Sequence, residues 1–324
     1  MMRRLTIVIL LLSAVIIGVA LWGQHLIEAP GPSSAETTVV ISRGQGPAAI
    51  GRRLEEAGVI ADRRLFHVAA WLSGAAAKLQ AGEYVFPAAV SVIDSLAILR
   101  AGRTVVRRIT IPEGLSSSEI VSRLLAHEAL TGTIDALPPE GALLPETYHF
   151  SFGQTRADIL KRMAAAMTAT VDRLWRDRAP DLPLASPAEA VILASIVEKE
   201  TALAVERPVV ASVFINRLRK GMRLQSDPTV VYALTGGPPL TRTLTRTDLR
   251  RPHPYNTYVI KRLPPGPIAN PGAAALAAVL RPAETDFLYF VADGTGGHAF
   301  ARTLAEHNRN VRAWRRLRDK KAAP

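Results

Sequence analysis

The chain has 324 residues, a formal net charge of +12 and no cysteine. This length suits one large domain or two smaller ones, and the lack of cysteine excludes disulfides, thiolate nucleophiles and cysteine-bound zinc. The seven histidines are scattered without the spacing of metal ligands, so we expect no metal site.

An apolar segment near the amino terminus predicts a membrane anchor. Residues 5–23 carry no charge and follow Arg3 and Arg4, and they are long enough to nearly cross a bilayer core about 30 Å thick. The two arginines favour a cytoplasmic amino terminus, residues 1–4, with the rest of the chain on the other side of the membrane. A cleaved signal peptide is the alternative, although no Ala-x-Ala-like site follows Trp22. For a chain exported in this way we expect no nucleic-acid partner, despite its positive charge.

A small α+β module is predicted after the anchor. Residues 24–37 include a stretch of proline, glycine and serine, which predicts a linker, and the module follows over residues 38–111. Runs of β-branched residues predict strands, while apolar positions four residues apart and terminating glycines predict helices. The predicted strands cover 38–41, 84–86 and 105–111, and the predicted helices cover 47–57, 62–73 and 92–99.

A larger α+β domain is predicted over residues 112–318, with a basic tail over 319–324. A Ser-Pro-Ala-Glu sequence at residues 186–189 has the pattern of a capping box and starts a helix. Residues 190–197 are all apolar or small, so this helix should be buried on nearly every side. The other expected segments are helices over 117–127, 155–176, 206–220 and 306–320, an extended stretch over 143–148, a long functional loop over 221–272, and a buried strand over 287–292 before a glycine turn at 294–297.

Two glutamates stand at the end of the apolar helix. Glu198 and Glu200 are two residues apart, so on a helix they point about 200° away from each other and only one can enter a given cleft. Glu200 continues the bulkier apolar stripe that ends at Ile196 and Val197, which favours it as a general acid with a raised pKa. Glu198 is the second choice. The alternative is that both carboxylates only cap or solubilise the end of the helix.

The segments downstream of this helix carry groups suited to a sugar ligand. Residues 225–227 offer an amide, a hydroxyl and a carboxylate, and residues 255–258 alternate aromatic rings with an amide. The proline-rich stretch 264–272 is stiff and is expected to form a fixed wall. Each segment could also serve only as scaffolding, because Asp227 and Asn270 are typical turn residues.

Several motifs together carry a specific resemblance. They are the segments 198–201, 212–218, 221–229, 255–258, 263–268 and 289–298. In these motifs, the chain resembles the YceG-like family, the MltG-type endolytic murein transglycosylases. The likeness covers nearly the whole chain, including the anchor and an amino-terminal module that resembles a LysM-like domain.

This resemblance implies cleavage, without water, of the β-1,4 bond between N-acetylmuramic acid and N-acetylglucosamine in peptidoglycan glycan strands. Glu200 falls on the family's catalytic glutamate. It would protonate the leaving oxygen and then act as a base while the muramyl 6-hydroxyl closes a 1,6-anhydro ring. An intramolecular nucleophile removes the need for a second carboxylate that ordinary glycosidases have. Candidate substrate-binding residues are Gln225, Ser226, Asp227, Tyr255, Asn256, Tyr258, Asn270 and, more weakly, Glu146.

The resemblance also implies where the protein works. We expect no cofactor, a single-pass location in the bacterial inner membrane with a periplasmic catalytic domain, and termination of nascent strands beside penicillin-binding peptidoglycan synthases. Three alternatives remain. One is a hydrolytic muramidase with Asp227 or Glu146 as second carboxylate, and another is a non-catalytic wall-binding scaffold. A serine peptidase built on Ser195 and Lys199 is disfavoured by their spacing and by the dry helix around Ser195.

Overall fold

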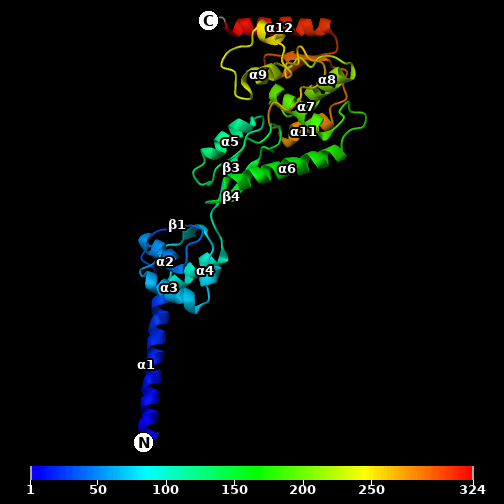
Figure 1. The fold of residues 1–324 in the computed structure, drawn as a ribbon. Coiled ribbons are helices and arrows are strands. Elements are labelled where there is room, and N and C mark those ends of the chain that lie inside the picture. The colour runs from blue at the N-terminus through cyan, green and yellow to red at the C-terminus, as the bar shows by residue number, and fades with distance from the viewer. Residues whose placement is uncertain (1, 323–324) are drawn as a thin grey trace. The chain divides into compact units, whose positions relative to one another are not determined.

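The computed structural model describes the backbone of residues 2–322 and the side chains of residues 6–319. Residue 1 of the predicted cytoplasmic segment and residues 323–324 of the predicted tail lie outside this range. The chain forms two compact units, Met1–Arg108 with His149–Gln154, and Ile109–Tyr148 with Thr155–Pro324. Both contain helices and short strands (Figure 1), which confirms the predicted α+β class.

The first unit begins with the apolar helix α1, Met2–Glu28. Its segment Thr6–Glu28 is long and apolar enough to cross a membrane, a property that an anchor and a signal sequence share. The helix continues five residues into the predicted linker. The next residues are also fixed, since the N–H of Gly31 donates to the carbonyl of Ala89 over 3.2 Å. A Cβ on Gly31 would lie 2.4 Å from the carbonyl oxygen of Val59, so this close approach requires glycine.

The core of the first unit lies between a two-stranded sheet and three helices. Strand β1 runs antiparallel to β2, with Thr37 opposite Phe86. The largest buried side chains are Tyr84, Phe66 and Phe86. The predicted helices and strands of this unit are present, with ends shifted by one or two residues, and a short 3₁₀ turn is added. The elements are β1 (Thr37–Ile41), α2 (Pro47–Glu56), α3 (Arg63–Leu72), η1 (Ala76–Lys78), β2 (Gly82–Phe86), α4 (Val92–Ala101) and β3 (Val106–Thr110).

Helix α7, Pro187–Glu200, is the centre of the second unit (Figure 1). It contacts α6 (Arg156–Arg176), α8 (Arg207–Arg219), α9 (Asp227–Thr235) and α11 (Ala273–Leu280). Every residue from Ala190 to Val197 is buried, as the sequence predicted. A helix that is apolar on all sides needs partners on all sides, and these four helices provide them. The end of α7 therefore emerges from a dry core.

Three predictions for the second unit were incomplete or wrong. The expected loop over 221–272 contains α9 and α10 (Arg246–Arg250), and α11 follows it directly. Helix α9 starts where Asp227 and Pro228 occupy its first turn, a position that tolerates proline. Strand β5, Tyr289–Ala292, is half-buried rather than buried, and it pairs antiparallel with the unpredicted β6, His298–Ala301. The remaining elements are α5 (Ser117–Leu125) and α12 (Leu304–Ala322). Strand β4 (Thr147–Ser151) pairs with β3, and each of these two strands has residues in both units.

Candidate active site

Glu200 is the last residue of α7, and a buried hydroxyl holds its carboxyl group. The Oγ of Ser226 donates a hydrogen bond of 2.6 Å to Oε1 of Glu200. Ser226 is itself fixed, because its N–H donates to Oγ1 of Thr257 over 2.9 Å and its carbonyl accepts from Oγ1 of Thr229 over 2.6 Å. The two threonine hydroxyls are 2.8 Å apart. This buried network joins the start of α9 to the segment around Thr257 and fixes the geometry at Glu200.

The surroundings of Glu200 favour its protonated form. Burial raises the pKa of the Glu200 carboxyl to about 7, and the negative charge of Asp227 acts in the same direction. The hydrogen bond from Ser226 and the positive charges of His298 and Arg217 oppose this rise, since they favour the carboxylate. A carboxyl with a pKa near 7 can donate a proton and take one back at neutral pH.

Asp227 and Tyr258 form a second polar pair beside this carboxyl. The Oη of Tyr258 donates to Oδ1 of Asp227 over 2.6 Å. Burial, together with this bond and the charge of Asp227, raises the pKa of the Tyr258 hydroxyl. Asp227 is exposed at the first turn of α9 and follows Ser226 directly in the chain. The structure thus brings Ser226, Asp227 and Tyr258 together around Glu200.

Glu198 has a different environment on the same helix. Its Oε2 accepts from the N–H of Gly272 over 2.9 Å, and its Oε1 lies 3.2 Å from Nη2 of Arg207. The side chain is only 4% exposed, and burial raises its pKa. Both oxygens are therefore engaged in holding the loop at Gly272 and the start of α8. The scaffolding alternative fits Glu198, while Glu200 faces the polar network.

Two of the predicted sugar-binding amides are used inside the protein. The Nδ2 of Asn256 donates to three backbone carbonyls within residues 248–251, and its Oδ1 accepts from the N–H of Tyr258. Oδ1 of Asn270 accepts from the N–H of Leu143 over 3.0 Å. Both side chains are fully buried. Their amides fix the loops that line the site, and the structure gives them no open face toward a ligand.

The other candidates differ in exposure. Gln225 is exposed and adopts a left-handed φ of 50°, which is uncommon for a residue other than glycine. Tyr255 is half-buried, with its ring 4.8 Å from that of Tyr232. Glu146 is exposed, and within residues 6–319 no hydrogen bond or ion pair joins it to Glu200. Gln225 is thus placed next to Ser226, whereas Glu146 is not brought into contact with the candidate acid.

Sequence reasoning assigned no role to two residues near Glu200, His298 and Arg217. Nδ1 of His298 lies 2.7 Å from Oε2 of Glu206, and the His298 N–H donates to Oε1 of the same carboxylate. Arg217 is buried, and its Nη1 donates to the carbonyl of Leu224 over 2.6 Å. Both residues fall in the motifs that carried the family resemblance. Glu206 and His298 are 92 residues apart, however, so no local pattern signals their contact.

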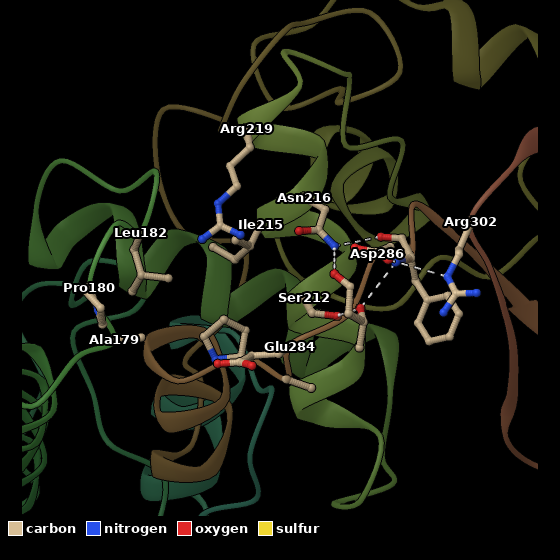
Figure 2. Close-up of a pocket in the computed structure, with 14 residues that line it drawn as sticks. Ala179, Pro180, Leu182, Ser212, Ile215, Asn216, Arg219, Glu284, Asp286 and Arg302 are labelled. Atoms are coloured by element: carbon tan, nitrogen blue, oxygen red, sulfur yellow. Dashed lines mark hydrogen bonds and ion pairs between the residues drawn. The ribbon is translucent and has the colours of Figure 1, made fainter.

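A cavity of about 510 Å³ lies elsewhere in the second unit, along α8 (Figure 2). Ser212, Asn216 and Arg219 line it together with residues 282–287. Figure 2 shows Asn216 and Ser212 directed toward this segment, and Nδ2 of Asn216 donates to the carbonyl of Thr285 over 2.7 Å. None of the predicted site residues lines the cavity. Among residues 2–322, no group of three or more His, Asp or Glu side chains is arranged to hold a metal ion.

Comparisons with known proteins identify relatives of this chain. The endolytic murein transglycosylase of Bacillus subtilis (strain 168) is 33% identical, over 90% of this chain and 89% of its own length. A protein of the same name from Streptococcus pneumoniae serotype 2 is 29% identical, and the match spans 89% of this chain but 61% of that protein. The crystal structure of a YceG-like protein from Listeria monocytogenes matches 86% of this chain and 99% of its own, with 32% identity and a TM-score of 0.53. The model of the YceG-like family matches residues 39–313, and the chain therefore belongs to the YceG-like family.

Proposed function

We propose that the protein is a lytic transglycosylase that cuts murein glycan strands internally and leaves 1,6-anhydro-muramyl ends. The observation that carries this proposal is the carboxyl of Glu200, which has a pKa raised to about 7 and is held by Ser226. Membership of the YceG-like family and the names of its relatives support the same reaction.

The geometry suggests how one carboxyl performs both proton transfers. Because Oε1 of Glu200 accepts the Ser226 bond, the acidic proton belongs on Oε2. That proton passes to the glycosidic oxygen as its bond to the muramyl C1 breaks. The resulting carboxylate then removes the proton of the muramyl 6-hydroxyl, whose oxygen bonds to C1 and closes the anhydro ring. The negative charge of Asp227 would stabilise the cationic sugar between these two steps.

We propose that the protein works at the bacterial inner membrane. The apolar helix α1 supports a single-pass anchor in the bacterial inner membrane, with the amino terminus in the cytoplasm and the catalytic domain in the periplasm. We keep the interpretation of residues 38–111 as a LysM-like module and of residues 112–318 as the catalytic domain. Strand termination beside penicillin-binding synthases follows from the same resemblance.

The origin of the oxygen atom that becomes bonded to the muramyl C1 distinguishes the two reaction classes. Full-length protein in detergent would digest purified murein in water enriched in heavy oxygen, and the new strand ends would be weighed by mass spectrometry. A lytic transglycosylase yields anhydro ends, which are lighter by one water and carry no heavy oxygen. Reducing ends with heavy oxygen would establish the hydrolytic muramidase instead. Lack of any cleavage by folded protein would favour the wall-binding scaffold.

A further inference from the structure

Three arginines surround a hollow beside the candidate active site. Arg223, Arg246 and Arg250 line a space of about 410 Å³ together with Tyr258 and two aliphatic residues, Leu249 and Val259. All three arginines are exposed. Within residues 6–319, no ion pair or side-chain hydrogen bond engages their guanidinium groups. We call this feature the arginine pocket.

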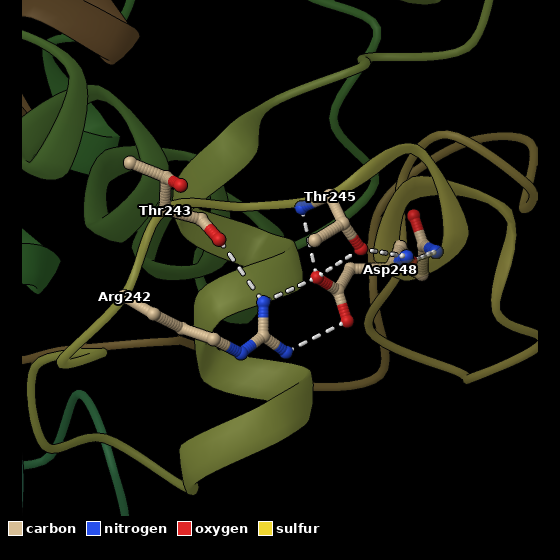
Figure 3. Close-up of polar contacts among 5 residues, drawn as sticks. Arg242, Thr243, Thr245 and Asp248 are labelled. Atoms are coloured by element: carbon tan, nitrogen blue, oxygen red, sulfur yellow. Dashed lines mark hydrogen bonds and ion pairs between the residues drawn. The ribbon is translucent and has the colours of Figure 1, made fainter.

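The acidic residue of the helix that carries two of these arginines does not neutralise them. Two arginines of the pocket belong to α10, whose capping box is formed by Thr245 and Asp248. The carboxylate of Asp248 is bound by Arg242 through contacts of 2.6 and 3.0 Å, as Figure 3 shows. Hydrogen bonds from Arg242 hold the pKa of Asp248 well below its usual range. The acidic residue within α10 is thus paired with Arg242, and this pair and Asn256 fix the helix that carries Arg246 and Arg250.

The arginine pocket shares Tyr258 with the candidate active site. Tyr258 lines the pocket, and its hydroxyl donates to Asp227, the residue after Ser226. Ser226 in turn holds the carboxyl of Glu200. A strand bound at Glu200 would therefore have a cationic hollow nearby, at Tyr258.

We infer that the arginine pocket binds the carboxylates of the peptide stem on the glycan strand; this rests on the proposed function. N-acetylglucosamine is uncharged, and the lactyl carboxyl of N-acetylmuramic acid is neutral where it is joined to a stem as an amide, whereas the stem peptide ends in carboxylates. Guanidinium groups bind carboxylates through paired, charge-assisted hydrogen bonds. A stem can occur on every muramyl residue, so a carboxylate is available near each scissile bond. The lipid diphosphate of a growing strand occurs only at its end, which makes it the less suited occupant.

The test compares two strand types with two matched variants of the full-length protein. The substrates are soluble glycan oligomers that keep their peptide stems and the same oligomers stripped of stems by an amidase, with the lactyl carboxyls that the amidase exposes converted to methyl amides. The pocket variant is Arg246→Gln with Arg250→Gln. The control is Arg173→Gln with Arg312→Gln, which removes two exposed charges from α6 and α12. We expect the pocket variant to lose about tenfold more kcat/KM on stem-bearing than on stripped strands, a difference of about 1.4 kcal/mol. The control should show equal ratios on both substrates.

Binding measured without turnover separates this inference from the proposed function. In the Glu200→Gln background, the stem-bearing oligomer should bind about tenfold more weakly after the pocket substitutions, and added salt should reduce the difference. Equal losses on both strand types, in rate and in binding, would overturn the inference. A third substrate, stripped oligomers that carry a terminal lipid diphosphate, tests the other occupant. A loss of rate and binding confined to this substrate would also overturn the inference. If no oligomer is cleaved but the binding difference persists, only the proposed reaction fails.

Discussion

The hydroxyl of Ser226 donates a 2.6 Å hydrogen bond to the carboxyl of Glu200, and the two residues lie at opposite ends of the segment 200–226, which contains helix α8. One end of this contact is the last residue of the buried helix α7, and the other is the cap of α9. The dry core raises the pKa of Glu200, while the hydroxyl orients it and moderates the rise. The contact thus fixes the position of the carboxyl, while burial is the main cause of its raised pKa.

The pH dependence of the wild-type enzyme follows from this environment. Glu200 must be protonated to act as the acid, and burial raises its pKa from 4.5 to about 7. Cleavage should therefore be present below this value and fall as the pH rises through about 7. Initial rates of anhydro-end formation across pH 5 to 9 (a range of about four units) would measure this fall, the alkaline limb of the rate profile. An activity that rises through neutral pH would contradict the role of an acid.

Ser226→Ala removes the hydroxyl that favours the carboxylate. The pKa of Glu200 should rise further, since the lost bond was lowering it, and the alkaline limb of the rate profile should move to higher pH. The rate at low pH should fall about tenfold, because a bond worth about 1–1.5 kcal/mol no longer orients the carboxyl. Ser212→Ala, on α8 and in the separate cavity, is the matched control. An unmoved limb would show that the hydroxyl does not act on the titrating group.

Glu200→Gln should stabilise the protein in a pH-dependent manner. A carboxyl whose folded pKa is raised binds its proton more tightly in the folded state, so stability is lost as the pH rises from about 4.5 to about 7. The amide of the glutamine variant does not ionise, so the variant does not lose this stability as the pH rises. We expect a gain of about 1–3 kcal/mol at pH 8 (one unit or so above the raised pKa) and almost none near pH 4. Thermal melting of the wild type and the variant at both pH values measures this gain. An equal gain in melting temperature at about pH 4 and pH 8 would refute the raised pKa of Glu200.

Asn256→Ala should lower stability more than it changes substrate affinity. The buried amide donates to three carbonyls within residues 248–251 and accepts from Tyr258. Removing it leaves these groups unsatisfied, at about 1–3 kcal/mol. We expect a lower melting temperature and little change in the affinity for stem-free glycan strands. A rise in KM with an unchanged melting temperature would instead make Asn256 a sugar ligand.

Local sequence patterns predicted the elements that local physics determines. The capping-box pattern at residues 186–189 and the apolar run after it gave the position and burial of α7. Because Glu198 and Glu200 are two residues apart on a helix, they were predicted to face different partners, and they do. Helices α9, α10 and α11 were missed, because they are short and the proline and glycine residues in and around them are typical of a loop. The capping box of α10 is formed by Thr245 and Asp248, and Arg242, six residues before Asp248, binds the same carboxylate.

The roles of the polar side chains depended on distant contacts. Asn270 and Asn256 have the chemistry of sugar ligands, yet their amides bind the backbone. The pairing of Glu206 with His298 joins α8 to β6 across 92 residues. No periodicity or spacing encodes such a contact, so the sequence could not assign these residues.

The measurement that tests the central claim most directly is a product analysis with single carboxyl substitutions. Full-length Glu200→Gln would be compared with Glu128→Gln, an exposed glutamate of the same unit. After digestion of purified murein, mass spectrometry would count anhydro-muramyl ends, with melting curves as the check on folding. We predict that Glu200→Gln melts at or above the wild-type temperature and forms no anhydro ends, while Glu128→Gln matches the wild type. Anhydro ends formed by Glu200→Gln at the wild-type rate would show that another group supplies the proton.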